Sequence, residues 1–342
     1  MLKVAIVILN WNGKEILNTY LPSVIKNSDC AEIIVADNGS TDNSISFLKE
    51  EYPQVRIIDN KENLGFAEGY NKALKEVDAD YYVLLNSDVE VTPLWINPII
   101  ELMEKDQLIA CCQPKILSYL EKNKFEYAGA AGGYIDYLGY PFCRGRVFND
   151  TEEDKGQYDD EKEIFWATGA SLFVRANVYN KLGGLDNDFF AHQEEIDFCW
   201  RVKNAGYKIY YCPKSVCYHL GGGTLNKTSP FKTFLNFRNN LYLLYKNLPK
   251  DKQIKIFVLR LPLDIIASFS FLMQGKGGEF KAVFKAYIAF LKTKHLFKAK
   301  RTAIPNKNIK EIYPKSIVLS YYLKSKKKFS ELKFKQWLLN IN

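Results

Sequence analysis

The first 117 residues of this chain alternate short apolar runs with stretches in which apolar positions recur every three or four residues. The apolar runs predict strands at Val4–Leu9, Glu32–Ala36, Val55–Asp59, Tyr81–Leu85 and Ala110–Leu117. The periodic stretches predict helices at Lys14–Ile25, Ser44–Glu51, Gly69–Glu76 and 94–105. Strands that alternate with helices in this order indicate a mostly parallel sheet with helices on both faces.

The next stretch has no clear period. Residues 118–160 are rich in glycine and run into an acidic segment that ends at Glu163. We therefore expect a mobile surface loop or lid here. Regular patterning returns over Ile164–His219, where Ile209–Cys212 and Val216–Tyr218 read as strands.

The pattern changes again after Gly223. Helical spacing predicts helices at Phe231–Leu248, Ile256–Met273 and Phe280–Lys300. The middle one is strongly apolar but contains Arg260, Pro262 and Asp264. A spanning helix needs about 20 apolar residues without such charges. We therefore expect this helix to lie in a membrane interface or to pack on the body of the protein.

Charge separates the same two parts of the chain. Residues 226–342 contain 25 Lys and Arg against five Asp and Glu, a net charge of +20, whereas residues 1–225 carry −12. A basic segment rich in aromatic residues favours an anionic partner surface, either a membrane or a nucleic acid.

The N-terminal sequence and the cysteines indicate the cellular compartment. No charged leader with an apolar core opens the sequence, so no secretory signal is predicted. The seven cysteines are odd in number and lack zinc-ligand spacing. This usage indicates buried thiols in a reducing cytoplasm.

Polar residues follow two of the predicted strands. Asp37 ends the second strand and opens the turn Asp37–Ser44, while Asn86 and Asp88 follow the run Tyr81–Leu85. Ligands of open α/β sheets bind at the carboxyl ends of the strands, and a carboxylate there can hold a divalent cation. The Asp37 carboxylate could accept the imide N–H of a pyrimidine, although such residues are also ordinary in strand-to-helix turns.

The segment Asn63–Asn71 follows the third strand. Its glycines permit close backbone approach, and a helix beginning near Ala67 would offer free N–H groups to an anion. The alternative is a glycine-bearing connection, since the spacing does not match the dinucleotide fingerprint.

A third acidic cluster lies downstream. At helical spacing Glu194 and Asp197 share one face, and Glu195 points elsewhere. Clustered acids raise one another's pKa, which suits one of them to act as a general base near neutral pH. The alternative is a solvated acidic helix start. His219, beside Gly221–Gly223, is a candidate for a metal or diphosphate contact.

Taken in this order, these residues resemble the inverting glycosyltransferases of family two, which have the GT-A fold, and especially the bacterial rhamnosyltransferase-like members. The matching segments are Asn10–Gly13, Asp37–Ser44, Asn63–Asn71, Asn86–Asp88, Trp166–Ala170, Gly183–Asp186, Glu194–Arg201 and His219. The resemblance implies a GT-A type, Rossmann-like catalytic domain over residues 1–225, with a nucleotide-sugar half (about 1–117) and an acceptor half (about 118–225). Residues 226–342 would form a helical, basic, membrane-associating extension.

The resemblance also implies roles for individual residues. Asp37 would bind the pyrimidine base of a UDP- or dTDP-sugar, and Asp88 with His219 would bind Mn²⁺ or Mg²⁺. The remaining nucleotide-sugar contacts would be Asn10, Asn63, Gly65, Asn71 and Asn86. Asn86 replaces the first Asp of the family's D-x-D motif, and a site with fewer charges should hold its metal less tightly.

The catalytic base follows from the same comparison. In the family's E-D-x-D pattern the second acid is the base, which places Glu195 in that role and leaves Glu194 as the alternative. Asp197 would support the base. Trp166, Gly169 and Arg201 would shape the acceptor pocket. The reaction implied is inverting transfer of a sugar, such as rhamnose, to a glycan or polyprenyl-linked glycan in cell-surface polysaccharide synthesis, at the inner face of the cell membrane.

Three other functions remain open at this point. A sugar-nucleotide nucleotidyltransferase also uses a Rossmann-like half with carboxylate-held metal, but Val4–Gly13 lacks the basic glycine-rich loop. A nucleic-acid-binding protein could use the +20 segment, but the acidic body would repel phosphates. Asn86 and Glu195 each stand where the family usually has Asp, and these two departures also allow a non-catalytic relative.

Overall fold

The computed structural model describes residues 2–221, 229–301 and 309–334. The expected boundary near residue 225 and part of the glycine run Gly221–Gly223 lie outside the described residues. Elements of the first half are β1 (Val4–Asn10), α1 (Lys14–Asn27), β2 (Glu32–Asp37), α2 (Ser44–Glu51), β3 (Arg56–Asp59), α3 (Gly65–Leu74), β4 (Tyr81–Asn86), β5 (Val89–Val91), α4 (Asn97–Lys105) and β6 (Ile109–Ser118).

The second half contains shorter strands and longer helices. Its elements are β7 (Gly133–Asp136), β8 (Pro141–Cys143), β9 (Arg146–Val147), β10 (Asp150–Thr151), β11 (Lys162–Glu163), β12 (Ser171–Arg175), α5 (Ala176–Lys181), η1 (Asn187–Phe189), α6 (Glu194–Asn204), β13 (Lys208–His219), α7 (Pro230–Asn247), α8 (Lys250–Met273), α9 (Gly277–Thr293), η2 (Lys294–Phe297), β14 (Ile312–Tyr313), α10 (Ile317–Tyr322) and η3 (Phe329–Glu331).

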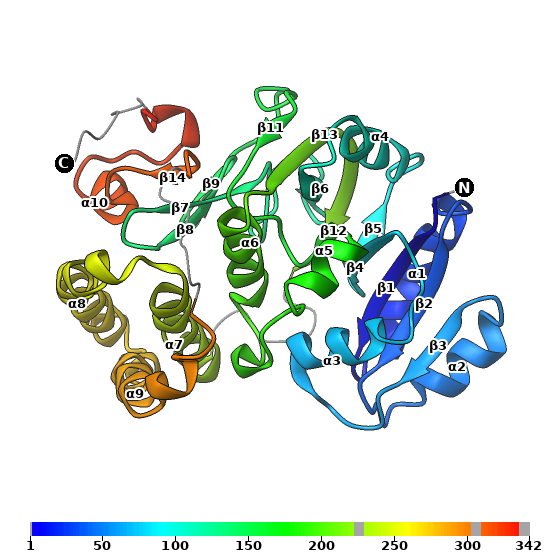
Figure 1. The fold of residues 1–342 in the computed structure, drawn as a ribbon, viewed down its shortest axis with the longest axis horizontal. Helices are drawn as coiled ribbons and strands as arrows, with labels where there is room; N and C mark the ends of the chain where they lie inside the picture. The colour runs from blue at the N-terminus through cyan, green and yellow to red at the C-terminus, as the bar shows by residue number, and fades with distance from the viewer. Residues whose placement is uncertain (1, 222–228, 302–308, 335–342) are drawn as a thin grey trace.

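The central sheet crosses the molecule in the order β11-β13-β6-β12-β4-β1-β2-β3, with β5 paired to β13 (Figure 1). Strands β4, β1, β2 and β3 are mutually parallel, and so are β6 and β13. β12 runs antiparallel between these two groups. The predicted alternation of strands and helices is thus confirmed, and β13 joins the two predicted runs into one strand with an irregularity between Cys212 and Val216.

Both faces of this sheet are covered because side chains alternate along each strand. On β1, Ala5 and Val7 pack in the cluster that contains residues of α3, α5 and α6. Ile6 and Ile8 pack in the opposite cluster, with residues of α1, α2 and α4. Burial on both faces explains why these strands read as continuous apolar runs in the sequence.

The prediction of a surface loop or lid over residues 118–160 is wrong. This segment forms β7 to β10 of a second sheet, in the order β10-β9-β8-β7-β14, and every residue of β7 is buried. The sheet is completed by β14, which comes from the C-terminal part of the chain. Its strands are only two to four residues long, so no periodicity marked them in the sequence.

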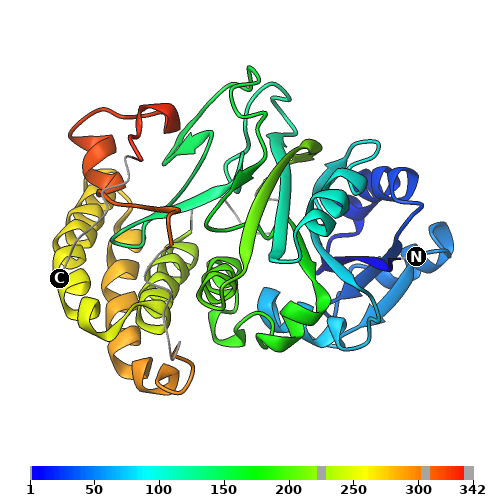
Figure 2. The same ribbon diagram turned by 45° about the horizontal axis from the view of Figure 1, so that its top comes forward.

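The C-terminal helices α7, α8 and α9 pack together beside α6, at the end of the molecule opposite β3 (Figures 1 and 2). Among the described residues, α8 is the one helix long and apolar enough to cross a membrane by length and composition alone. Only 22% of its most apolar stretch is buried.

Candidate functional site

Polar residues end three neighbouring strands at one edge of the central sheet. Asn10 and Asp37 are direct partners in the pairing of β1 with β2, and Asn86 pairs with Leu9 of β1. Asn10 Nδ2 donates to Asp37 Oδ2 at 2.8 Å, and the Ser40 backbone N–H donates to Asp37 Oδ1 at 2.7 Å. These residues share one edge because the strands are parallel and their carboxyl ends lie together, and their contacts with a nucleotide sugar stay predictions.

Asn10 also has an unused acceptor. It is 1% exposed, and its Oδ1 has no hydrogen-bond partner among the described residues. Gly13 lies directly beside it, because a Cβ there would come within 2.5 Å of Asn10 Oδ1. A buried amide oxygen without a partner is costly, so this atom indicates a place where a donor group from a ligand would be stabilised.

A second pair of amides supports this edge and was not predicted. Asn60 directly follows β3, and its Nδ2 donates to Asn38 Oδ1 at 2.9 Å and to the Gly69 carbonyl at 3.2 Å. Asn38 Nδ2 donates to the Gly65 carbonyl at 2.8 Å. Both amides are buried. The sequence signal that could have identified Asn60 is its position directly after a predicted strand, which is also the position of Asn86.

The N-terminus of α3 differs from its prediction. The helix begins at Gly65, whose φ is +73°, whereas the sequence predicted a helix over Gly69–Glu76 with a start near Ala67. The side chain of Asn63 accepts from the Gly65 N–H at 3.0 Å, and the Phe190 carbonyl accepts from the Phe66 N–H at 2.8 Å. These N–H groups are therefore bound by the protein itself, and the expectation of free donors for an anion is wrong for them.

Asn71 connects α3 to the turn before η1. Its Oδ1 accepts from Tyr179 Oη at 2.7 Å and from the Leu185 N–H at 3.0 Å. Its Nδ2 donates to the Leu185 carbonyl at 2.7 Å and to Asn187 Oδ1 at 2.6 Å. The amide thus holds two elements together in this structure, and direct contacts of Asn63, Gly65 and Asn71 with a nucleotide stay predictions.

The predicted metal ligands do meet. His219 Nε2 lies 3.1 Å from Asp88 Oδ1 and 3.4 Å from Asn86 Nδ2, and both Asp88 and His219 are buried. On the other side of the ring, His219 Nδ1 lies 3.2 Å from Glu126 Oε2. Burial alone would lower the pKa of His219, but the hydrogen bonds and charges of Asp88 and Glu126 outweigh it and raise that pKa to about 10.

This donor set fits a divalent cation that is also held by a substrate. Asp88 Oδ1 and His219 Nε2 lie 3.1 Å apart, and a carboxylate oxygen and an imidazole nitrogen are both atoms that would bind a divalent cation. Glu126 can accept a hydrogen bond from the Nδ1–H of His219, which would leave Nε2 as the ligand atom. No group of three His, Cys, Asp or Glu with metal-binding spacing occurs in the described ranges. The protein would therefore supply few ligands, and the rest would come from diphosphate and water.

The acidic pair begins α6. Glu194 is 4% exposed and Glu195 is half-buried, and one carboxylate oxygen of each has no hydrogen-bond partner among the described residues. Burial raises the pKa of Glu195 to about 7, and burial together with the Glu195 charge raises the pKa of Glu194 well above its usual range. Their unpaired oxygens favour a site that receives a proton, in place of the solvated helix start that was the alternative.

Gly169 joins this pair to the strand ends. A Cβ on Gly169 would lie 3.2 Å from the Phe66 ring and 3.9 Å from the Glu195 Cβ. Its neighbour Ala170 accepts from the Asn86 backbone N–H at 3.0 Å. The segment Gly169–Ala170 therefore lies next to Glu195 through Gly169 and next to Asn86 through Ala170.

The turn before α6 is strained and is held by α7. Phe190, His192 and Gln193 have φ values of 65°, 69° and 74°, which non-glycine residues rarely adopt. Asn239 Nδ2 donates to the carbonyls of Phe189, Ala191 and His192 at 2.7–2.9 Å. The strained backbone that carries the acids is thus fixed by a residue from the basic C-terminal part.

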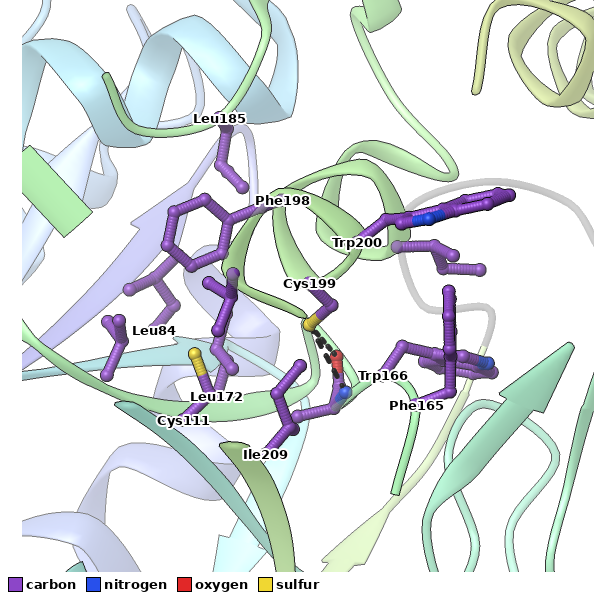
Figure 3. Packing of buried hydrophobic residues seen from close by; sticks show 14 of the residues in the cluster. Leu84, Cys111, Phe165, Trp166, Leu172, Leu185, Phe198, Cys199, Trp200 and Ile209 are labelled. Atoms are coloured by element: carbon purple, nitrogen blue, oxygen red, sulfur yellow. Dashed lines mark hydrogen bonds between the residues drawn. The ribbon is translucent and has the colours of Figure 1, made fainter. Parts of the chain in front are cut away.

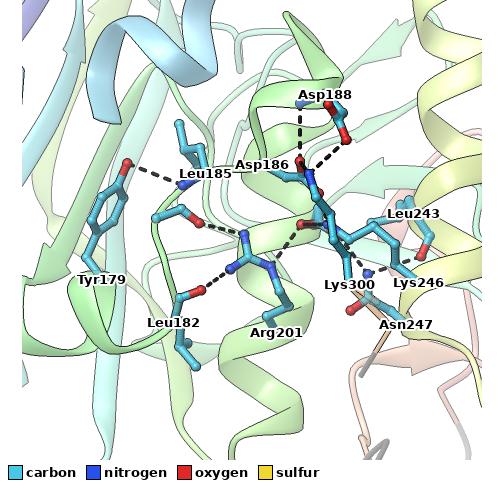
Figure 4. Close-up of polar contacts among 12 residues, drawn as sticks. Tyr179, Leu182, Leu185, Asp186, Asp188, Arg201, Leu243, Lys246, Asn247 and Lys300 are labelled. Atoms are coloured by element: carbon cyan, nitrogen blue, oxygen red, sulfur yellow. Dashed lines mark hydrogen bonds and ion pairs between the residues drawn. The ribbon is translucent and has the colours of Figure 1, made fainter. Parts of the chain in front are cut away.

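Asp197 lies in a buried ion-pair network. Figure 4 shows Asp186, Arg201 and Lys246 of this network. Its Oδ2 accepts from Lys246 Nζ at 2.8 Å and from Arg201 Nε at 2.9 Å. Lys246 also binds Asp186 at 2.5 Å. Burial opposes ionisation of Asp197, but Lys246 and Arg201 lower its pKa to about 2. The remaining N–H groups of Arg201 donate to the carbonyls of Leu182 and Gly184. This network secures α6, and contacts of Asp197 or Arg201 with an acceptor stay predictions.

Trp166 lies in the core between the two sheets. Its ring packs on Gly133, where a Cβ would come within 2.1 Å, and its indole N–H donates to the Tyr134 carbonyl at 3.0 Å. Close by, Cys199 and Phe198 of α6 pack with Leu84 and Cys111 of the central sheet (Figure 3). The ring is 4% exposed, so the structure gives it a packing role, and an acceptor contact stays a prediction.

Comparisons with known proteins show which proteins this chain is similar to. Residues 5–164 match the family described as "Glycosyl transferase family 2". The N-acetylglucosaminyl-diphospho-decaprenol L-rhamnosyltransferase of Mycobacterium tuberculosis is 25% identical over 205 residues, which cover 55% of this chain and 66% of the relative, slightly under two thirds of its length. An uncharacterized glycosyltransferase of Haemophilus influenzae is 27% identical over 238 residues, covering 66% and 67%.

One solved structure supports the fold. The crystal structure of GalNAc-T7 with UDP, GalNAc and Mn²⁺ has a TM-score of 0.57, is 17% identical, and covers 90% of this chain and 59% of that chain. At this identity the likeness shows the fold alone. The predicted GT-A type architecture is confirmed.

Proposed function

Because residues 5–164 form a glycosyl transferase family 2 domain, we propose that this protein transfers a sugar from a nucleotide-diphosphate donor to a glycan or lipid-linked glycan, with inversion. The donor is a UDP- or dTDP-sugar, with dTDP-rhamnose as the first candidate because of the rhamnosyltransferase relative. The observation that carries the proposal is the shared carboxyl-end edge of β4, β1 and β2, where Asn86, Asn10 and Asp37 end the strands. Gly169 and Ala170 link this edge to α6, where one oxygen each of Glu194 and Glu195 has no partner among the described residues.

The donor binds along the strand ends. The buried Asp37 carboxylate accepts the imide N–H of the pyrimidine. Asn10 Oδ1, which has no hydrogen-bond donor among the described residues, accepts a second hydrogen bond from the ligand. Asp88 and His219 would hold Mn²⁺ or Mg²⁺, and Glu126 would orient the imidazole. A bound divalent ion supplies positive charge that stabilises the leaving diphosphate.

The acceptor hydroxyl is deprotonated by Glu195. Burial keeps the pKa of this carboxylate near the working pH, where it can take a proton efficiently. Glu195 is also half-buried whereas Glu194 is buried, so Glu195 is the acid that an incoming hydroxyl can reach. Gly169 leaves the space beside the Glu195 Cβ. The hydroxyl oxygen then attacks the anomeric carbon as the bond to the diphosphate breaks.

The protein works at the inner face of the cell membrane. The M. tuberculosis relative is named for a decaprenol-linked substrate, and residues 226–342 of this chain carry a net charge of +20. A lipid-linked acceptor would be presented at an anionic surface that attracts such a segment.

The experiment that tests the donor site measures thermal unfolding with a panel of uridine, thymidine, guanosine and cytidine diphosphates and their sugars, with and without Mn²⁺. Ligand at a hundredfold over its dissociation constant adds about 2.7 kcal/mol of stability. A metal-dependent shift with uridine or thymidine compounds, lost in Asp37→Ala and kept in the control Asp106→Asn at the α4–β6 turn, is expected. Stabilisation by none of the nucleotides would overturn the proposal.

A further inference from the structure

Helix α8 has its polar and apolar sides reversed relative to a helix on a water-soluble protein. Its four buried residues are Ile256, Arg260, Asp264 and Ser268, which are spaced four apart and form one inward stripe. Between residues 257 and 273 the charged residues are Arg260 and Asp264, and these are 3% and 1% exposed. A helix on a soluble protein buries its apolar stripe and exposes its charges.

The inward charges are satisfied by the body of the protein. Arg260 Nε donates to Asp264 Oδ2 at 2.9 Å, and Arg260 Nη1 donates to the Leu138 carbonyl at 3.0 Å. The hydroxyls of Tyr140 and Tyr287 both donate to Asp264 at 2.6 Å. These contacts fix α8 to the β7–β8 turn and to α9, so the outward direction of its other side chains is set by the fold.

From residue 257 to its end, the outward side of α8 is apolar apart from the exposed Ser270. Residues 257–273 form a strip about 26 Å long at 1.5 Å per residue, and no exposed charge interrupts it. Its large exposed side chains, together with Ile254 in the preceding turn, are 42–88% exposed: Ile254, Val258, Leu259, Leu261, Ile266, Phe269, Leu272 and Met273. The neighbouring α9 adds Phe284, Ile288 and Leu291. A continuous exposed strip of this kind marks an interaction surface.

Cations surround this strip. The exposed lysines on and next to the two helices are Lys250, Lys252, Lys255, Lys281, Lys285, Lys292, Lys294 and Lys298. In the same stretch the acids are Asp251, the buried Asp264 and the partly buried Glu279. An apolar strip with a cationic rim complements a bilayer whose headgroups are anionic, because acyl chains and headgroups satisfy the two parts separately.

We propose that α8 and α9 form a membrane-docking face, with α8 lying in the plane of an anionic bilayer. The strip enters the acyl-chain boundary and the lysines contact the headgroups. Arg260 and Asp264 keep the inner side of α8 against the protein, so the helix docks on the bilayer without crossing it. The proposal rests on the proposed membrane-surface function and identifies the elements that carry it. Figures 1 and 2 show both helices at the end of the molecule away from β1 to β3.

The test uses the full chain and vesicles of phosphatidylcholine with or without phosphatidylglycerol, in the absence of nucleotide and acceptor. Sedimentation gives the partition coefficient. The variants are Val258→Glu and Phe269→Glu, singly and combined, and the matched control is Leu108→Glu, an exposed leucine at the α4–β6 turn. Each α8 variant should weaken binding to anionic vesicles about tenfold or more, because one inserted apolar side chain is lost. The control should bind as the unmodified protein does.

Several results would overturn the proposal. The first is unchanged binding by the combined variant. The second is equal binding of the unmodified protein to purely zwitterionic vesicles. The third is a dimer in solution that ignores vesicles and that Phe269→Glu dissociates, since the strip would then face a second copy. Unchanged nucleotide-induced stabilisation in the α8 variants shows that they are folded. Loss of vesicle binding would therefore not count against the proposed donor site, and absence of nucleotide binding would not count against the membrane-docking face.

Discussion

Replacement of Lys246 by Met should destabilise the whole chain, because Lys246 joins α7 to the acid-bearing helix α6. Lys246 is 2% exposed and its Nζ lies 2.5 Å from Asp186 and 2.8 Å from Asp197. Methionine keeps most of the volume and removes the charge. The two buried carboxylates would then face each other without the cation between them.

The expected loss of unfolding free energy depends on the ion pairs that Lys246→Met leaves in place. Removing one partner from a buried ion pair costs about 3–5 kcal/mol. Lys300 still binds Asp186 and Arg201 still binds Asp197, so the lower end, about 3 kcal/mol, is expected. The pKa of Asp197 gives a similar value for the lost stability. The pKa of Asp197 is lowered from 3.8 to about 2, and this difference corresponds to about 2 kcal/mol of stability at neutral pH.

The pH dependence has a definite sign. A carboxyl whose pKa is lowered in the folded state adds stability above its ordinary pKa and loses that contribution as the pH falls toward the folded value. The stability difference between the unmodified protein and Lys246→Met should therefore be full at pH 7 and shrink between about pH 4 and pH 2.

Urea unfolding at several pH values is the assay, with Lys250→Met, an exposed lysine just beyond α7, as the control. The double variant Lys246→Met/Asp197→Asn should be more stable than the sum of the two single losses predicts, by at least about 1 kcal/mol. A loss below about 1 kcal/mol at pH 7, or strict additivity with Asp197→Asn, would refute the reasoning.

Three further predictions concern the site itself. Glu195→Gln should lower kcat by about 10²–10⁴-fold while stabilisation by the donor persists. The kcat of the unmodified protein should rise with pH through about 7, the pKa of Glu195. The same pH profile in Glu195→Gln and in the unmodified protein would contradict this assignment. Glu194→Gln should raise thermal stability at pH 8, because burial raises the pKa of Glu194 and its charged form is costly there; a lower Tm would count against it. Glu126→Gln should weaken Mn²⁺-dependent stabilisation by diphosphate about tenfold or more without changing metal-free nucleotide binding, measured by titration calorimetry; equal Mn²⁺ affinity would exclude an orienting role.

Part of the site was predictable because its residues follow strands directly. Asp37, Asn86 and Asp88 each end or follow a buried strand, and the parallel topology brings those ends to one edge. His219 was expected to meet Asp88 only through the family resemblance, and the structure places them 3.1 Å apart.

Other parts of the site depend on contacts between distant segments. Glu126 lies in a stretch without periodicity, and its pairing with His219 joins residues 93 positions apart. The two residues meet because β13 pairs with β6 in the central sheet and the Glu126 N–H donates to the Ile116 carbonyl of β6. Lys246 was counted as one of many basic residues in a terminal segment, yet it is buried against Asp186 and Asp197. A charge pattern along the chain gives the sign of a surface, but it does not show which lysine leaves that surface for the interior.

Helix α8 shows the same division most clearly. Its length, its apolar character and the positions of Arg260 and Asp264 are properties of the sequence alone. Which face of α8 is buried is not given by the sequence, because the same helix could bury its apolar face in the core of a soluble protein. Tyr140, Tyr287 and the Leu138 carbonyl decide it by offering hydrogen-bond partners to the two charges, since a buried charge requires such partners and an exposed leucine does not.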